Sequence, residues 1–485
     1  MGGVFLMIYL LFRLIPIRLI EIYFIPVLLF LFVYQLSIGL KQLYHFYHSD
    51  SIHLHITGSL QNSGIYSIYL AVHLPLAFYY VKKIRRVILQ RLALVFISMV
   101  VLSVIYFTKS RTAIVVLAAL ALIHLLPVIK SNLHRYNKYI IPTFFLSLII
   151  GGYFLFLWKP HSALGRLLIS KISLLHIKEY LFTGVGYGEF YRNYPLWQIQ
   201  YFQTITDKNI GEILFADESF LAYNEPLQLI VETGTMGFLA VTAILFYIFR
   251  KTFHPNEFCK TLQTTVALIL ISSLFSYTLH VNSIIFLFVL CIAVFSPKVF
   301  QQKINLSTRY FLPLFALNCL LITQVFYLLN DVFQWDKLSN DVLLSEKQLS
   351  EEYRKIYPSL KQSGKFMLDY SQVLFLSNDK FAYTIIERTK ADFPSVATFS
   401  TEYQIAERQD DYKSMIESYK QLCGIQPYKF SFREKLMTQY IKTNDMLNAV
   451  KEAKLILSIP IKIPSQTIDS IRIRARDFLL DSNHP

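Results

Sequence analysis

The chain has 485 residues, of which 54% are hydrophobic, 15% are aromatic and only 16% are charged. This composition is typical of an integral membrane protein and excludes an ordinary soluble enzyme of the same length. The formal charge of +15 would suggest a nucleic-acid partner in a soluble protein, but much of the excess lies in short loops between apolar runs, where membrane topology explains it.

Nine apolar stretches come close to the length that crosses a bilayer. They cover residues 22–40, 64–81, 89–107, 112–129, 139–158, 226–249, 261–279, 282–297 and 309–329. A tenth stretch, 4–20, is interrupted by Arg13 and Arg18 and has no small-residue cleavage site, so no cleavable signal peptide is predicted. We therefore predict an all-α polytopic membrane protein of about nine or ten transmembrane helices.

The loops between these stretches indicate the orientation. Four of them are basic and are expected in the cytoplasm: 81–91, 130–138, 250–260 and 298–309. The segment 159–225 and the chain after residue 330 then lie on the opposite face. Cys259 is expected on the cytoplasmic side and Cys423 outside. The four cysteines form no CxxC pair, so neither a disulfide framework nor a zinc site is predicted.

The tail, residues 331–485, is more polar and has helical periodicity. Prolines recur at intervals of about 34 residues, at positions 358, 394, 427 and 460. Between them, "LSNDKFAYTIIE", "AERQDDYKSMIE" and "IKTNDMLNAVKE" occupy equivalent places as a polar turn that enters a second amphipathic helix. This period is typical of tetratricopeptide repeats, and an irregular helical bundle is the alternative. In either case we expect a binding surface for a protein partner, following a membrane domain at 1–330.

Several basic residues are candidates for phosphate binding. Lys109 and Arg111 lie on a very short loop on the side opposite to the basic loops. Contact with lipid headgroups explains this pair, and capture of a phosphate or diphosphate by the arginine fork is the alternative. Arg166 lies on a predicted amphipathic helix near the membrane surface, 163–182.

Two other patterns in the sequence do not predict a ligand site. "GVGYGEF" has GxGxG spacing without a surrounding βαβ unit, so it predicts a tight turn at Gly184, Gly186 and Gly188 and no dinucleotide site. Four loop histidines are possible metal ligands, but we predict no metal. They are His45, His48, His53 and His55.

The stretch 226–249 begins with polar residues. On a helix, Asn224, Gln228 and Glu232 form one polar stripe about 12 Å long, and the free N–H groups at the helix start favour an anion. Gly234 and Gly237 would let another helix approach closely. Polar residues in a membrane are candidates for function, with interhelical hydrogen bonding as the alternative. We predict a site for a polar headgroup attached to a lipid.

Three fragments in chain order resemble one family, the O-antigen ligase and polymerase superfamily. "ITGSLQNSGIYSIYLAVHLPLA" (56–77) resembles its glycine–asparagine segment, and "SRTA" (110–113) resembles its Ser-Arg signature. "GRLLISKISLLHIKEYLFTGVGYGEFYRNYP" (165–195) is similar to its outer-loop pattern of an arginine, an amphipathic helix and a glycine turn.

A fourth fragment, "YNEPLQLIVETGTMG" (223–237), resembles the ligase signature of His, then Asn, Ser or Gln, then nine residues and GxxG. The residues at matching positions are Asn224, Gly234 and Gly237. Tyr223 stands in place of the family histidine, which is proposed to activate the acceptor hydroxyl. The resemblance covers about residues 56–300.

The resemblance implies glycan transfer at the periplasmic face of the bacterial inner membrane, without a cofactor. The donor would be an undecaprenyl-diphosphate-linked glycan. The acceptor would be a lipid A-core sugar for a ligase, another lipid-linked glycan for a polymerase, or a protein hydroxyl for an O-oligosaccharyltransferase. In this family arginines, and not metal ions, are thought to hold the diphosphate. The expected diphosphate-binding residues are Lys109, Arg111, Arg166 and Asn224.

The candidate catalytic residues are Tyr223, Glu225 and Glu218. A phenol with an ordinary pKa near 10 is a poor base at neutral pH, so one of the two carboxylates is the expected base. A membrane-anchored repeat scaffold without catalysis is the alternative from another class. A secondary transporter is less suitable, because no paired interrupted segments occur in two matching halves.

Overall fold

A computed structural model describes residues 2–49, 54–125, 150–154, 156–158, 160–203, 209–251, 256–296, 308–341 and 343–482. Over these ranges all regular structure is helical and no strand occurs, which confirms the all-α class for the described part of the chain. The predicted span 139–158 and the basic loops 130–138 and 298–309 lie largely outside the described residues, and His53 lies outside them entirely.

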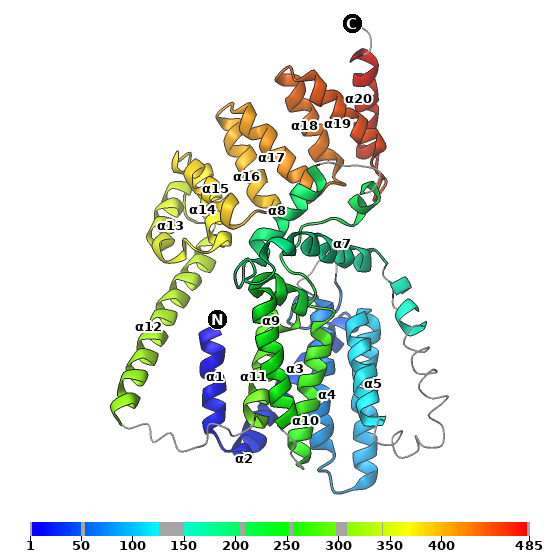
Figure 1. Ribbon diagram of the computed structural model, residues 1–485, viewed down its shortest axis with the longest axis vertical. Helices are drawn as coiled ribbons and strands as arrows, with labels where there is room; N and C mark the ends of the chain where they lie inside the picture. Colours follow the sequence, from blue (N-terminus) through cyan, green and yellow to red (C-terminus); the bar gives the residue numbers. More distant parts are fainter. Residues whose placement is uncertain are drawn as a thin grey trace. The chain divides into compact units, whose positions relative to one another are not determined.

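Contacts divide the chain into two compact units (Figure 1). The first comprises Met1–Pro160, Leu181–Gly184 and Leu221–Val299, and the second comprises His161–Tyr180, Val185–Phe220 and Phe300–Pro485. The predicted membrane domain includes the whole of segment 159–225, whereas by contacts most of this segment belongs to the second unit together with the tail.

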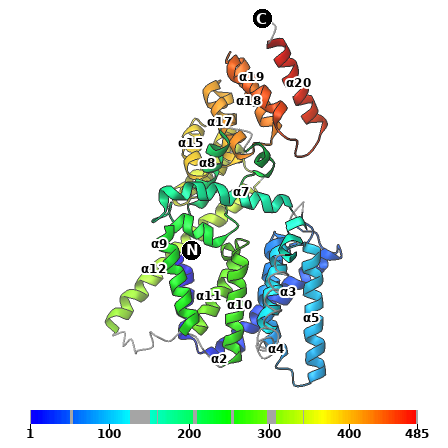
Figure 2. The same cartoon turned by 45° about the vertical axis from the view of Figure 1, so that its right-hand side comes forward.

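The first unit is a bundle of helices, and α3, α4 and α5 run side by side in it (Figures 1 and 2). Its elements are α1 (Gly2–Leu14), α2 (Ile17–Leu19), η1 (Ile20–Phe24), α3 (Ile25–Leu43), α4 (Ser63–Val81), α5 (Val87–Thr108), the helix Arg111–Leu125, α9 (Glu225–Lys251), α10 (Glu257–Ser273), η4 (Thr278–His280) and α11 (Asn282–Phe295).

Within the described residues, four helices are long and apolar enough to cross a membrane: Ile17–Leu43, Ser63–Val81, Val87–Thr108 and Glu225–Arg250. Three shorter helices are also apolar: Gly3–Leu14, Arg111–Leu125 and Asn282–Phe295. These helices support a membrane-embedded protein. The larger number of nine or ten spans, and the orientation, remain predictions.

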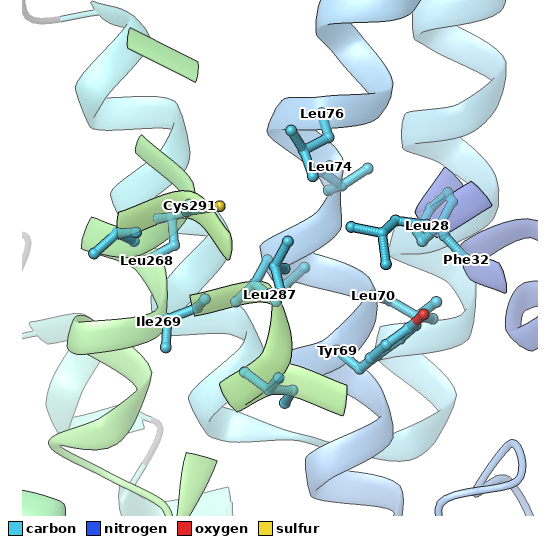
Figure 3. Close-up of a cluster of buried hydrophobic side chains, with 14 of the residues drawn as sticks. Leu28, Phe32, Tyr69, Leu70, Leu74, Leu76, Leu268, Ile269, Leu287 and Cys291 are labelled. Atoms are coloured by element: carbon cyan, nitrogen blue, oxygen red, sulfur yellow. The ribbon is translucent and has the colours of Figure 1, made fainter. Parts of the chain in front are cut away.

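Helix α4 lies in the core of the first unit. The Asn62 side chain accepts hydrogen bonds from the N–H groups of Gly64 and Ile65, so it caps the helix start, a contact that stabilises a helix by about 1 kcal/mol. Apolar side chains of α3, α4, α10 and α11 pack together at its middle (Figure 3). The labelled members are Leu28, Phe32, Tyr69, Leu70, Leu74, Leu76, Leu268, Ile269, Leu287 and Cys291.

The second unit contains the tail and two insertions from segment 159–225. Its elements are α7 (Pro160–His176), η2 (Ile177–Tyr180), α8 (Phe190–Gln203), η3 (Ile210–Phe215), α12 (Thr308–Ser339), α13 (Glu346–Leu360), α14 (Gly364–Leu376), α15 (Phe381–Asp392), α16 (Val396–Arg408), α17 (Tyr412–Ile425), α18 (Phe430–Lys442), α19 (Met446–Ser458) and α20 (Gln466–Ser482). The closest pairs are α14 with α15, α16 with α17, and α18 with α19.

The three helix pairs share one turn chemistry. Asn378, Asp410 and Asn444 all have positive φ, at 58°, 52° and 61°, which short polar side chains tolerate better than most. In the second and third turns the next residue, Asp411 or Asp445, caps the following helix. These turns lie in the three polar segments predicted to be equivalent. The tail is therefore a series of helix pairs, and its assignment as tetratricopeptide repeats stays a prediction.

Helix α8 packs against α17 inside the second unit. A Cβ on Gly424 would lie 2.7 Å from the Cα of Ile199, so glycine permits this close approach. Gln198 Nε2 donates to the carbonyl of Ile425 at 2.6 Å, and Gln426 Nε2 donates to Asp217 at 2.7 Å. The segment 185–220 is thus an integral part of the second unit.

Candidate functional site

The start of α9 is shaped by two residues of the fourth fragment. Asn224 Oδ1 accepts a hydrogen bond from the N–H of Leu227 at 2.9 Å, so it caps the helix and satisfies one of its free donors. Tyr223 has a φ of 53°, a left-handed conformation that costs a bulky residue about 1–2 kcal/mol. Its ring packs edge-on against Tyr277, with centroids 5.5 Å apart. Backbone strain of this kind clusters at functional sites.

Gln228 and Glu232 follow on the same face of α9, and the two residues are only 4% and 5% exposed. Gln228 Nε2 donates to Glu232 Oε1 at 2.9 Å, and Gln228 Oε1 accepts the N–H of Ala222 at 3.1 Å. Because an N–H group holds the amide oxygen and a carboxylate holds the amide nitrogen, the hydrogen-bond network assigns the orientation of this amide.

A histidine absent from the sequence-based candidates completes this network. His280 belongs to η4, the turn between α10 and α11, and its Nδ1 lies 3.1 Å from Glu225 Oε1. The same oxygen accepts the N–H of Leu279 at 2.9 Å, so the carboxylate is held by two donors. His280 Nε2 lies 3.2 Å from Gln228 Nε2. The side chain of His280 is 40% exposed and that of Glu225 is 11% exposed.

The carboxylate changes the acidity of the imidazole. The hydrogen bond to Glu225 raises the pKa of His280 above its usual value, and it outweighs the opposite effect of partial burial. The sequence signal for His280 is its position. Residues 280–281 form the predicted turn between the spans 261–279 and 282–297, on the same predicted side of the membrane as segment 159–225.

Two buried hydroxyl groups flank His280 in the chain. The side-chain oxygens of Thr278 and Ser283 are inaccessible to solvent and have no hydrogen-bond partner among the described residues. A buried hydroxyl without a partner costs about 1–3 kcal/mol, and such groups in a folded protein call for a specific explanation. The turn therefore carries more polar groups than the surrounding side chains satisfy.

Helix α9 is interrupted at Gly234, two residues after Glu232. Gly234 has a φ of 69° and a ψ of −178°, a conformation that is essentially restricted to glycine. The N–H of Thr235 donates to the carbonyl of Leu181 at 2.8 Å, a bond outside the helix. The predicted span 226–249 is thus two helical pieces joined at a non-helical residue.

Each of the two segments joined by this hydrogen bond has a glycine at the contact, and these glycines make the close approach possible. A Cβ on Gly234 would lie 2.1 Å from the carbonyl oxygen of Phe182, and a Cβ on Gly184 would lie 2.4 Å from the carbonyl oxygen of Glu232. The sequence predicts that another helix approaches Gly234. The structure places the segment Leu181–Gly184 there instead. A Cβ on Gly237 would meet the Thr233 side chain of its own helix at 2.3 Å.

The predicted cations of the first unit lie between α5 and the next helix. Lys109 is exposed and ends α5 with a φ of 53°, and Arg111 is partly buried at the start of the helix Arg111–Leu125. Just before them, Thr108 Oγ1 lies 2.6 Å from Ser67 Oγ on α4. The first fragment of the resemblance therefore contacts the end of α5, two residues before the second fragment.

The remaining predicted residues belong to the second unit. Arg166 lies on α7 and is partly exposed. Gly186 and Gly188 have φ values of 116° and 80°. Glu218 accepts the N–H of Val396, at the start of α16, at 2.6 Å. Convergence of Arg166 with Arg111 is still a prediction.

The two candidate carboxylates thus have different surroundings. Burial raises the pKa of Glu218, but its contact with the first turn of α16 gives it a structural task as a helix cap. Glu225 instead faces a titratable partner, His280. Of the two, Glu225 is the one placed for acid–base chemistry.

No family model, no curated protein and no solved structure matches the chain. Over the described residues, no group of three or more His, Cys, Asp or Glu side chains is arranged to hold a metal ion. The interpretation of the site therefore rests on its geometry and on the resemblance of the four fragments.

Proposed function

We propose that the protein transfers a glycan from an undecaprenyl-diphosphate-linked donor to an acceptor at the periplasmic face of the bacterial inner membrane. The apolar helices of the first unit support a membrane location. The four fragments support the family, and the polar start of α9 supports a site for a lipid-linked polar group.

One observation carries the proposal: the third and fourth fragments meet. The glycine turn of the third fragment contacts the GxxG end of the fourth through Gly184, Gly234 and the hydrogen bond from Thr235 to Leu181. The two fragments are separate stretches of the sequence, and a contact between their glycines is what a shared site requires. Broken helices with non-helical backbone at the break are also a common way to build polar sites in membrane proteins.

Different residues are proposed to bind the donor and to face the acceptor. Lys109, Arg111, Arg166 and Asn224 are proposed to bind the donor diphosphate, with the arginines as bidentate partners. The network of Glu225, Gln228 and His280 is proposed to face the acceptor hydroxyl. A lipid A-core sugar, a second lipid-linked glycan and a protein hydroxyl all present the same reacting group, so ligase, polymerase and O-oligosaccharyltransferase reactions share this site.

The proposal is tested in a strain from which the gene is deleted. We expect undecaprenyl-diphosphate-linked glycan to accumulate, and the wild-type gene to restore transfer. Arg111→Ala should fail to restore it although the protein inserts normally, and the matched control Arg85→Ala, at an exposed predicted cytoplasmic arginine, should restore it fully. No accumulation in the deletion strain would favour the non-catalytic scaffold, and full restoration by Arg111→Ala would refute the proposed role of Arg111.

A further inference from the structure

We propose that His280, oriented by Glu225, accepts the proton of the acceptor hydroxyl, and that Gln228 covers its Nε2 atom until the acceptor binds. The inference rests on the proposed function, because it names the base of that same transfer. It assigns the base to the turn between α10 and α11, and not to the start of α9, where Tyr223 replaces the family histidine.

The hydrogen-bond network selects the imidazole tautomer. Gln228 Oε1 accepts the N–H of Ala222, so the Gln228 nitrogen is the atom that faces both Glu232 and His280. An amide nitrogen can only donate, and His280 Nε2 must therefore be an unprotonated acceptor. The proton of the neutral ring then lies on Nδ1 and is donated to Glu225. This is the tautomer in which Nε2 has a free electron pair for a base.

Glu225 acts in this arrangement as a positioning residue. Its Oε1 atom accepts both the Leu279 N–H and the His280 Nδ1–H, which fixes the carboxylate relative to the turn. A carboxylate in this position stabilises the imidazolium that forms when the ring accepts a proton, as in other carboxylate–histidine pairs. The charged groups that face the ring are Glu225 and Glu232, both on α9.

The reaction is balanced without a co-reactant. The acceptor oxygen attacks the anomeric carbon of the donor sugar, and a new carbon–oxygen bond forms. The bond between that carbon and the diphosphate oxygen breaks, and the diphosphate leaves with the electron pair. The hydroxyl proton moves to His280 Nε2 and is later released to water. The acceptor hydroxyl takes the place of the Gln228 amide at Nε2, a contact that is long at 3.2 Å.

The experiment uses the purified full-length protein in lipid nanodiscs. The donor is the lipid-linked glycan isolated from the deletion strain, with membranes of that strain as the source of acceptor, and turnover is measured as release of undecaprenyl diphosphate. Binding of undecaprenyl diphosphate itself is measured separately. His280→Gln should lower turnover by a factor of about 100 or more, the usual loss for a general base, with unchanged diphosphate binding. The control is His124→Gln, whose ring, among the residues that the structure describes, bonds to the carbonyl of Leu120 in its own helix.

Glu225→Gln provides the second measurement. Turnover requires neutral His280, so it falls as the pH drops below the pKa of the ring. Glu225 raises that pKa, and its replacement should move the acid limb of the pH profile to lower pH while lowering the rate. A carboxylate with a purely structural task would leave the limb in place.

Each outcome decides between the two proposals. Normal turnover in His280→Gln, an equal loss of diphosphate binding, or an unmoved acid limb in Glu225→Gln would overturn the assignment of the base and leave glycan transfer standing. A wild-type protein that neither binds undecaprenyl diphosphate nor releases it from the donor would overturn both.

Discussion

Replacement of Gly234 by alanine tests the break in α9. The φ and ψ values of 69° and −178° at this residue cost a residue with a side chain about 1–3 kcal/mol. The new Cβ would also lie 2.1 Å from the carbonyl of Phe182. The segment 181–184 must then move, and the hydrogen bond between Thr235 and Leu181, of about 1 kcal/mol, is lost. Together these effects destabilise the first unit by about 2–4 kcal/mol.

The change is measured as the Tm of the detergent-purified protein. At about 2–4 °C per kcal/mol for a unit of this size, Gly234→Ala should melt roughly 4–16 °C below wild type. Gly188→Ala is the matched control, because Gly188 also has a positive φ of 80° but no atom within 4 Å of the new Cβ. Its Tm should fall only by the amount that backbone strain causes. Gly211→Ala, with neither feature, should melt like wild type. A Gly234→Ala protein as stable as Gly211→Ala would refute the reasoning.

Three further predictions follow from the sequence and the two units. In transfer assays, Arg111→Lys should rescue Arg111→Ala poorly, because an ammonium lacks the planar fork; near-normal turnover of the lysine variant would argue against a bidentate clamp. Cys259, Cys291 and Cys423 are buried, so orientation is better tested with single cysteines introduced at exposed Lys260 and Lys413. An impermeant thiol reagent on spheroplasts should label only the cysteine at position 413. Labelling of the cysteine at position 260 alone would contradict the predicted orientation. The excised tail 335–485 should be helical by circular dichroism, and attachment of segment 185–220 should raise its melting temperature, since α8 covers α17; equal melting would mean that this packing contributes little.

The predicted spans that the structure describes follow from local signals. The stretch 64–81 corresponds to α4, Ser63–Val81, because a long apolar run begins at a capping asparagine, Asn62. The stretch 89–107 lies within α5, Val87–Thr108, because its apolar run is also long and uninterrupted. Equivalent turns in the tail were visible because the Asn and Asp residues that accept positive φ recur along the chain.

The parts that escaped prediction depend on contacts between distant residues. Hydropathy averaged along 226–249 does not detect the break at Gly234, because the break is stabilised by a hydrogen bond to Leu181. His280 is isolated in the sequence and becomes a partner of Glu225 only when η4 meets the start of α9. The polar stripe was visible in the spacing of Gln228 and Glu232, but the histidine that joins it was not.

The packing of α8 on α17 has a consequence for biosynthesis. Gln198 and its partner Ile425 are 227 residues apart, and chains grow at about 5–20 residues per second, so α8 is made roughly 10–45 s before the surface that covers it. During that interval the surface of α8 at Ile199, which packs on Gly424 of α17, has no partner from the tail, and such unpaired surfaces favour aggregation or chaperone binding. A truncation that removes the last helix pairs would therefore leave the nascent segment between α7 and α9 unprotected permanently, and the shortened protein should be degraded rather than accumulate with an altered specificity.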